Sequence, residues 1–248
     1  MPAWCQNDTR RYDTFAADLP HVIIWKGNII IPSFTVGRVQ ELLYVFKTHF
    51  DEWGIGDWEV FLDSPMGIEA TEVYAGHAQI FDESARKSRE QSGDPFDLPN
   101  LHLSRRSQDS MKINQIETGA IIIAGSGMCT GGRIKHHLKH NLWRKQTHVM
   151  IVGFQARGTL GRAIVDGARH IRLWGETIQV NAKVHTIGGL SAHADQQGLM
   201  DWYGHFVERP RVALVHGEPE AMDTLAQRLK SKYNADVVQA SFQQKLTI

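Results

Sequence analysis

The stretch GAIIIAGSGMCTGGRIKHHLKHNLW, residues 119–143, decides the fold of this protein. Its first part is an unbroken apolar run, which is typical of a strand that is buried on both faces. A glycine-rich turn follows, and residues 133–143 then predict a helix. The stretch therefore predicts a strand, a turn and a helix in succession, which is the repeating unit of α/β folds.

The same unit recurs at residues 28–53, 58–81 and 147–168. In 28–53, for example, the run NIIIPSF precedes a segment with apolar residues at helical spacing, among them Val39, Leu42 and Phe46. Strands that alternate with helices need crossover connections, and these produce parallel strands. The sequence predicts an α/β fold with a mainly parallel sheet that is flanked by helices.

Other parts of the chain depart from this pattern. Residues 87–115 are polar and contain two prolines, so we expect an irregular surface segment that ends in a short helix. Residues 171–189 predict short strands around a turn at Gly175 and Glu176, with antiparallel or edge character. The remaining expected elements are an amphipathic helix within 11–27, helices at 196–206 and 219–232, and strands within 211–217 and 235–241.

Composition limits the classes of protein that this chain can represent. Its 248 residues carry 27 basic and 27 acidic side chains, so nucleic-acid binding would require a local basic patch. Cys5 and Cys129 are far apart, which argues against a disulfide framework and favours a reducing compartment. No apolar run approaches the roughly 20 residues of a membrane helix, and residues 1–15 lack the core of a secretory signal. We expect a cytoplasmic protein that does not enter a membrane.

Three turns after predicted strands share one chemistry. Each combines glycine, which lets backbone N–H groups approach an anion, with an arginine that can hold a phosphate group. Because ligands of open α/β sheets bind at the carboxyl ends of strands, these turns predict a phosphate site. The alternative is tight packing at the sheet edge. The candidate phosphate-binding residues are Arg38, Ser126, Gly127, Arg133, Thr159 and Arg162.

Polar residues at the ends of two other strands are further candidates. Asp63 and Ser64 follow a predicted strand, where a carboxylate could bind metal or orient an arginine, although we favour a cap on the next helix. His216 ends an apolar run and is well placed as a metal ligand. His193 lies in a small-residue turn before a helix, a position that suits acid–base chemistry.

The histidines of segment 134–142 are more numerous but less specific. His136 and His140 have the spacing of a helical metal pair, yet no carboxylate lies between them. Lys135 and Lys139 favour a solvated basic face that includes His137. Such a face could contact an RNA backbone.

Six segments in order identify a family resemblance: IPSFTVGRVQELLY, LDSPMG, IIIAGSGMCTGGRIKHHL, VGFQARGTLGR, GGLSAHADQQGLMDW and LVHGEPEAMDTLA. Over about residues 20–235 the chain resembles the β-CASP branch of the metallo-β-lactamase-fold hydrolases. This branch includes the nuclease subunit of the eukaryotic polyadenylation factor, its archaeal and bacterial relatives, and ribonuclease J. The resemblance implies a β-CASP domain at 1–190 and the C-terminal portion of a metallo-β-lactamase αββα sandwich at 191–248.

The resemblance also implies a function. Members of the family hydrolyse RNA in a cleft that holds two zinc ions. His193 would act on the leaving group or the scissile phosphate, and His216 would be a zinc ligand. Ser126, Arg133 and Thr159, together with Arg162, would face the RNA path.

One departure from the family changes these expectations. The main zinc motif, HxHxDH, does not occur in this chain. A catalytic zinc ion needs about three protein ligands, and this chain offers at most one incomplete ligand set. We therefore expect the chain alone to bind single-stranded RNA without cleaving it. We also expect a homodimer, or a separate chain that supplies the other half of the fold. The alternatives are a non-catalytic RNA-binding or scaffold protein and a nucleotide-binding α/β protein.

Overall fold

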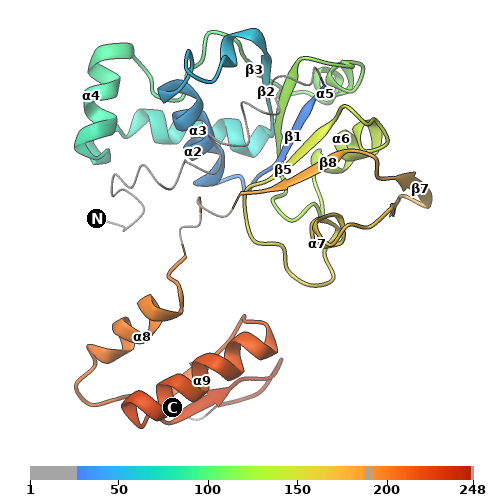
Figure 1. Ribbon diagram of the computed structural model, residues 1–248. Helices are drawn as coiled ribbons and strands as arrows, with labels where there is room; N and C mark the ends of the chain where they lie inside the picture. The colour runs from blue at the N-terminus through green and yellow to red at the C-terminus, as the bar shows by residue number, and fades with distance from the viewer. Residues whose placement is uncertain (1–26, 188–189, 191–192, 247–248) are drawn as a thin grey trace. The chain divides into compact units, whose positions relative to one another are not determined.

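The computed structural model describes residues 27–187, 190 and 193–246, so the helix expected within 11–27 falls almost entirely outside them. The chain divides into two compact units, Met1–Ser191 and Ala192–Ile248, and Figure 1 shows the elements of both. Whether these units correspond to the domains expected at 1–190 and 191–248 stays a prediction. None of the helices that the structure describes is long and apolar enough to cross a membrane.

The first unit is built on a six-stranded sheet in the order β3-β2-β4-β1-β5-β8, with every pairing parallel. The apolar run that opens the decisive stretch forms β4, which is buried along its whole length between β1 and β2. This sheet confirms the predicted α/β class. The strands are β1 (Ile29–Pro32), β2 (Glu59–Asp63), β3 (Leu101–Leu103), β4 (Ala120–Ala124), β5 (His148–Ile151) and β8 (Lys183–Thr186).

Helices cover both faces of this sheet (Figure 1). Because successive side chains of a strand point to opposite faces, Ile121 and Ile123 pack in one core cluster while Ile122 packs in another. Burial on both faces explains why the strands read as continuous apolar runs. The helices are α2 (Arg38–Thr48), α3 (Pro65–Gly76), α4 (Glu83–Ser92), α5 (Ser107–Ile113), α6 (Ile134–Asn141) and α7 (Leu160–Val165), with 3₁₀ turns η2 (Ile55–Asp57) and η3 (Ala78–Ile80).

Residues 87–115 are more regular than their composition predicts. They include the second half of α4, the edge strand β3 and the short helix α5, and only α5 was expected. Helix α4 begins after Asp82, whose side chain accepts a hydrogen bond from the Ala85 amide at 2.8 Å. Strand β3 has only three residues, and it exists because it pairs with β2. Pairing of this kind is a tertiary effect that local composition does not contain.

Residues 170–186 confirm the expected antiparallel and edge character. Strands β6 (His170–Leu173) and β7 (Glu176–Gln179) form an antiparallel hairpin. Its turn residues, Trp174 and Gly175, both have positive φ angles, 49° and 85°. Strand β8 then joins the main sheet at its edge, parallel to β5.

The second unit contains the four elements that the sequence predicts. They are α8 (Gln196–Gly204), β9 (Val212–Leu214), α9 (Pro219–Tyr233) and β10 (Val237–Gln239). The two strands pair in parallel, as expected for strands joined by a helix. A small core cluster holds the unit together, formed by Met200, Tyr203, Leu229 and Ala235.

Candidate functional site

A pocket of about 370 Å³ lies at the carboxyl ends of the central strands of the first unit. Neighbouring strands β1 and β4 lead into α2 and α6, which pack in different core clusters and therefore on opposite faces of the sheet. Ligands of open α/β sheets bind at such a switch point. The pocket is lined by Thr35, Asp63, Ser64, Pro65, Met66, Gly125, Ser126, Gly132 and Arg133.

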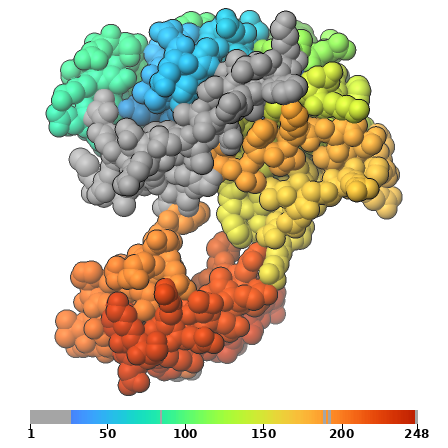
Figure 2. Space-filling model, in the orientation of Figure 1, coloured from blue at the N-terminus to red at the C-terminus, as the bar shows by residue number. Residues whose placement is uncertain are grey.

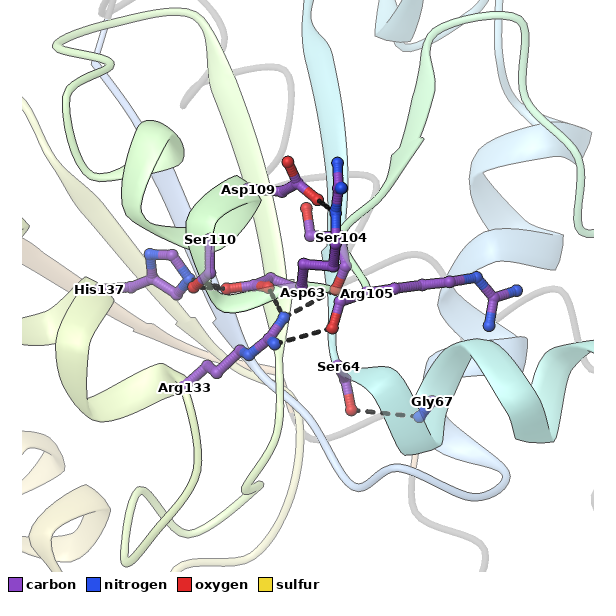
Figure 3. Close-up of polar contacts among 10 residues, drawn as sticks. Asp63, Ser64, Gly67, Ser104, Arg105, Asp109, Ser110, Arg133 and His137 are labelled. Atoms are coloured by element: carbon purple, nitrogen blue, oxygen red, sulfur yellow. Dashed lines mark hydrogen bonds and ion pairs between the residues drawn. The ribbon is translucent and has the colours of Figure 1, made fainter.

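Arg133 is held in the wall of this pocket by three acceptors. Its Nη1 atom donates to Asp63 Oδ1 at 2.6 Å and to the Ser104 carbonyl at 2.7 Å, while Nη2 donates to the Arg105 carbonyl at 2.9 Å (Figure 3). The Asp63 side chain is fully buried, and the Arg133 side chain is 19% exposed. A charge-assisted pair of this kind fixes the turn after β4 to the end of β2.

The second carboxylate oxygen of Asp63, Oδ2, accepts two further hydrogen bonds. Ser110 Oγ and His137 Nε2 both donate to Oδ2 at 2.6 Å. Burial alone raises the pKa of Asp63, but the hydrogen bonds from His137 and Ser110 and the positive charge nearby outweigh it and lower that pKa below its usual value. The carboxylate is therefore ionised at neutral pH.

This network corrects two expectations. The cap on α3 is Ser64, whose Oγ accepts from the Gly67 amide at 3.2 Å, whereas Asp63 orients an arginine. His137 does not belong to a solvated basic face, because its side chain is completely buried. A helix turned so that Ile134 and Leu138 face the core carries His137 inward with them.

The glycine-rich turn after β4 is shaped by close packing. Gly132 has a φ of 68°, and a Cβ there would lie 2.4 Å from the Gly125 carbonyl oxygen. A Cβ on Gly127 would lie 2.7 Å from the ring of Phe34. Ser126 is half-buried, with its Oγ 3.3 Å from that of Thr130. Of the predicted residues in this turn, Ser126 lines the pocket, and Gly127 is buried beneath an aromatic ring.

The turn after β5 lies against the same loop. The Gly161 amide donates to the Met128 carbonyl at 3.2 Å. Thr159 caps α7, since its Oγ1 accepts from the Arg162 amide at 3.2 Å, and Arg162 pairs with Asp166 at 2.8 Å. The side chains of Thr159 and Arg162 are thus partly exposed, and both also form contacts that stabilise α7.

Sequence reasoning missed Gln155. Its Nε2 atom donates to the carbonyl of Gly127 at 2.8 Å and also reaches the carbonyls of Gly153 and Phe154 at 3.1 Å. This buried amide ties the turn after β5 to the turn after β4. A glutamine between Phe154 and Ala156 carries no pattern that would have identified it.

Arg38, the remaining predicted phosphate residue, is the first residue of α2. Its guanidinium forms an ion pair with Glu41, and its side chain is only 11% exposed. Arg38, Arg133 and Arg162 therefore each have a carboxylate partner. Only Arg133 lines the pocket.

His193 and His216 both lie in the second unit and are exposed. His193 lies in a bend before α8, which is capped by Asp195 through a 2.7 Å hydrogen bond from the Gly198 amide. His216 follows β9 with a φ of 64°, a conformation that is uncommon outside glycine and that is enriched at functional sites. The catalytic role of His193 and the metal-binding role of His216 stay predictions.

The described parts of the chain contain no group of three or more His, Cys, Asp or Glu side chains that could hold a metal ion. A catalytic zinc ion needs about three such ligands. The described residues therefore do not make a complete zinc site by themselves, and we assign no reaction step to a metal.

Comparisons with known proteins agree with this architecture. Residues 39–164 match the Beta-Casp domain, and residues 177–239 match the Zn-dependent metallo-hydrolase RNA specificity domain. Ribonuclease TTHA0252 of Thermus thermophilus is 37% identical over 203 residues, which cover 82% of this chain and 46% of that protein. The transcription termination factor FttA of Pyrococcus abyssi is 35% identical over 214 residues, covering 84% of this chain and 33% of that protein.

FttA of Methanocaldococcus jannaschii is 33% identical over 199 residues, covering 77% of this chain and 31% of that protein. The chain thus spans about a third to a half of the length of the curated relatives it matches. Its parallel α/β unit matches the Beta-Casp domain, and the chain is similar to these relatives. This chain therefore belongs to the β-CASP family of metallo-hydrolases.

Proposed function

We propose that this chain is part of a zinc-dependent hydrolase that cleaves phosphodiester bonds in single-stranded RNA, and that the chain alone binds RNA without cleaving it. The observation that carries the proposal is the pocket at the carboxyl ends of β1, β2 and β4 in a chain of the β-CASP family. The RNA specificity domain and the name of the Thermus ribonuclease support RNA as the substrate class.

The pocket suits a phosphate group within a longer chain. Ser64, Ser126 and Arg133 are among the residues that line it. Because the ionised Asp63 carboxylate lies 2.6 Å from Arg133, it offsets much of the positive charge of that arginine. We therefore expect contacts that position an RNA backbone rather than tight capture of free phosphate.

The second unit would supply the residues of the reaction itself. His216 would contribute one ligand to zinc, with the other ligands coming from outside the described residues. His193 would protonate the leaving oxygen, a role for which a histidine is suited near neutral pH. Arg38, Thr159 and Arg162 would contact the RNA further from the scissile bond.

The test is an assay of binding and cleavage on labelled single-stranded RNA with excess zinc. We expect binding and no cleavage by the chain alone. Ser126→Ala should weaken binding a few-fold, by about the 0.5–1.5 kcal/mol that one hydrogen bond contributes. Robust zinc-dependent cleavage that disappears in His216→Ala would show that the chain is active by itself. No RNA binding at all would reject the proposal.

A non-catalytic RNA-binding role is the second candidate. The lack of a metal-binding cluster among the described residues favours it. The genomic reading frame upstream of Met1 distinguishes the two candidates. An HxHxDH motif in that frame supports the hydrolase, whereas a frame without it supports the binding role.

A further inference from the structure

The outward surface of α6 is basic although the chain as a whole is neutral. The helix contains no acidic residue, whereas the whole chain carries 27 basic and 27 acidic side chains. Its inward residues are buried in the core, and its outward residues form a row. This row consists of Lys135, His136, Lys139 and His140, followed directly after the helix by Trp143.

Two exposed tryptophans mark the ends of this row. Trp174, at the tip of the β6–β7 hairpin, is 53% exposed, and its ring centroid lies 4.5 Å from that of His136. Trp143 is 52% exposed. From His136 to Trp143 the distance along the helix axis is roughly 10 Å at 1.5 Å per residue. We call Lys135, His136, Lys139, His140, Trp143 and Trp174 the α6 stripe.

Each tryptophan is paired with a cation. The ammonium of Lys135 lies 5.0 Å from the Trp174 ring centroid, and the guanidinium of Arg144 lies 5.2 Å from that of Trp143. Such cation–π contacts hold the rings in place while leaving ring surface exposed. Both α6 and the hairpin reach the molecular surface, in yellow-green and gold (Figure 2).

The hairpin turn is an unusual place for a tryptophan. Trp174 and Gly175 have the two positive φ angles of a type I′ turn, where asparagine, aspartate and glycine are preferred at the first position. This backbone conformation does not favour a large aromatic side chain. At this position the ring lies outside the core and contacts His136 of α6.

The histidines add flat, uncharged rings between the tryptophans. Burial lowers the pKa of His136 and of His140, and the neighbouring histidine and lysine charges lower both further. Both rings are therefore mainly neutral at pH 7. Lys139 pairs with Glu176 at 2.6 Å, but Glu176 is 58% exposed, and such a surface pair exchanges readily for another anion.

We propose that the α6 stripe is a second contact surface for single-stranded RNA, on which bases stack on Trp174 and Trp143 while Lys135 and Lys139 face the phosphates. Helix α6 begins at Ile134, directly after the pocket residue Arg133, so RNA that leaves the pocket on this side meets the stripe. This inference rests on the proposed function, since it takes RNA as the ligand. It adds a location for the part of the RNA that extends beyond the pocket.

The experiment measures the affinity of the full chain for labelled single-stranded RNAs of about four and about twelve nucleotides, within the range of sites on stacking platforms. We expect Trp174→Ala to weaken binding of the longer RNA by roughly tenfold and to leave the shorter RNA unaffected. Trp174→Phe keeps a ring and should restore most of the affinity. Trp202→Ala, in the second unit, is the matched control because that side chain is 64% exposed.

A second variant separates charge from stacking. Lys135→Gln should reduce the slope of log affinity against log salt by roughly 0.7, whereas Trp174→Ala should leave the slope unchanged. Equal binding of the longer RNA by wild type, Trp174→Ala and Lys135→Gln overturns the α6 stripe and points to a protein partner for it. If the wild-type chain binds neither RNA, the proposed function fails and the stripe fails with it.

Discussion

The sheet of the first unit has six strands with helices on both faces, whereas the sheet of the second unit has two strands of three residues each. Strands β1, β4 and β5 of the first unit are buried along their whole length. In the second unit Val207 and Phe242 are 92% and 94% exposed. A two-stranded sheet is marginal without further packing, so we expect the second unit to need a partner for full stability.

This difference separates the residues of the proposed function into two groups. The pocket at the ends of β1, β2 and β4 is built on the six-stranded sheet and a buried ionic network, which preorganise it. His193 and His216 stand on the unit with the small core. We therefore expect the pocket to be formed by the chain alone, whereas the two histidines need a further partner to reach a working geometry.

The largest expected effect concerns the buried network of the first unit. Asp63→Ala leaves the charge of Arg133 without its carboxylate, so we expect the free energy of unfolding to fall by about 3–5 kcal/mol. Urea unfolding followed by circular dichroism measures it. The matched control is Asp236→Ala in the second unit, where the exposed pair with Arg211 is worth about 0–1 kcal/mol. Equal losses in both variants would contradict the contrast between the units.

The next effect concerns the small core of the second unit. Leu229→Ala should destabilise that unit by about 2–3 kcal/mol, towards the low end for a buried leucine because its surroundings are partly exposed. Hydrogen exchange read by mass spectrometry should show faster exchange in α8 and α9 only. Leu138→Ala, in the core of the first unit, should show the reverse pattern. Faster exchange throughout the chain in either variant would show that the units unfold together.

Acid should weaken the first unit through His148. This buried side chain lies 2.9 Å from His185, and burial, with charge from His185 and Lys183, lowers its pKa to about 4. The unfolded chain binds a proton near pH 6.5 and the folded chain only near pH 4, so the contribution is complete above pH 6.5 and is lost as the pH falls towards 4.

We expect a loss on the order of 2 kcal/mol between pH 7 and pH 4.5, measured as the free energy of unfolding of the first unit. His148→Gln should flatten this dependence because glutamine does not titrate. The second unit serves as the internal control. An unchanged pH profile in the variant would remove His148 as the cause.

The smallest expected effect concerns association. If the exposed apolar residues of the second unit bind another copy of the chain, Phe242→Ser should weaken the dimer about fivefold, or roughly 1 kcal/mol. Sedimentation velocity over a concentration series measures it. Phe154→Ser, at a residue of the first unit that is 60% exposed, should leave association unchanged. A wild-type chain that stays monomeric throughout the series would argue against a homodimer.

The sequence predicted the strands best where burial is strongest. Strands β1 and β4 are apolar along their whole length because both faces are covered, so one local pattern suffices. It failed at β3 and at the second half of α4. Strand β3 forms because it pairs with β2, which its own residues do not reveal. Helix α4 has no buried face that would produce a clear apolar period.

The residues of the candidate site likewise differ in how far local sequence predicts them. Glycine and arginine after β4 predicted a site at the carboxyl ends of the strands, and a pocket lined by Ser126 and Arg133 lies there. That this pocket binds a phosphate stays a prediction. The pairs of Arg38 with Glu41 and Arg162 with Asp166 lie within one helical turn and can be read from spacing. No local pattern revealed that Gln155 joins the two turns.

The sequence by itself determined the α/β class and the family, because these follow from apolar periodicity and from short motifs. Only the tertiary structure decided that Arg133 is bound by Asp63, that His137 is buried and that Trp174 lies against His136. These partners are far apart in the chain. They meet only because the parallel sheet and the β6–β7 hairpin bring them together, which is information that no stretch of sequence contains alone.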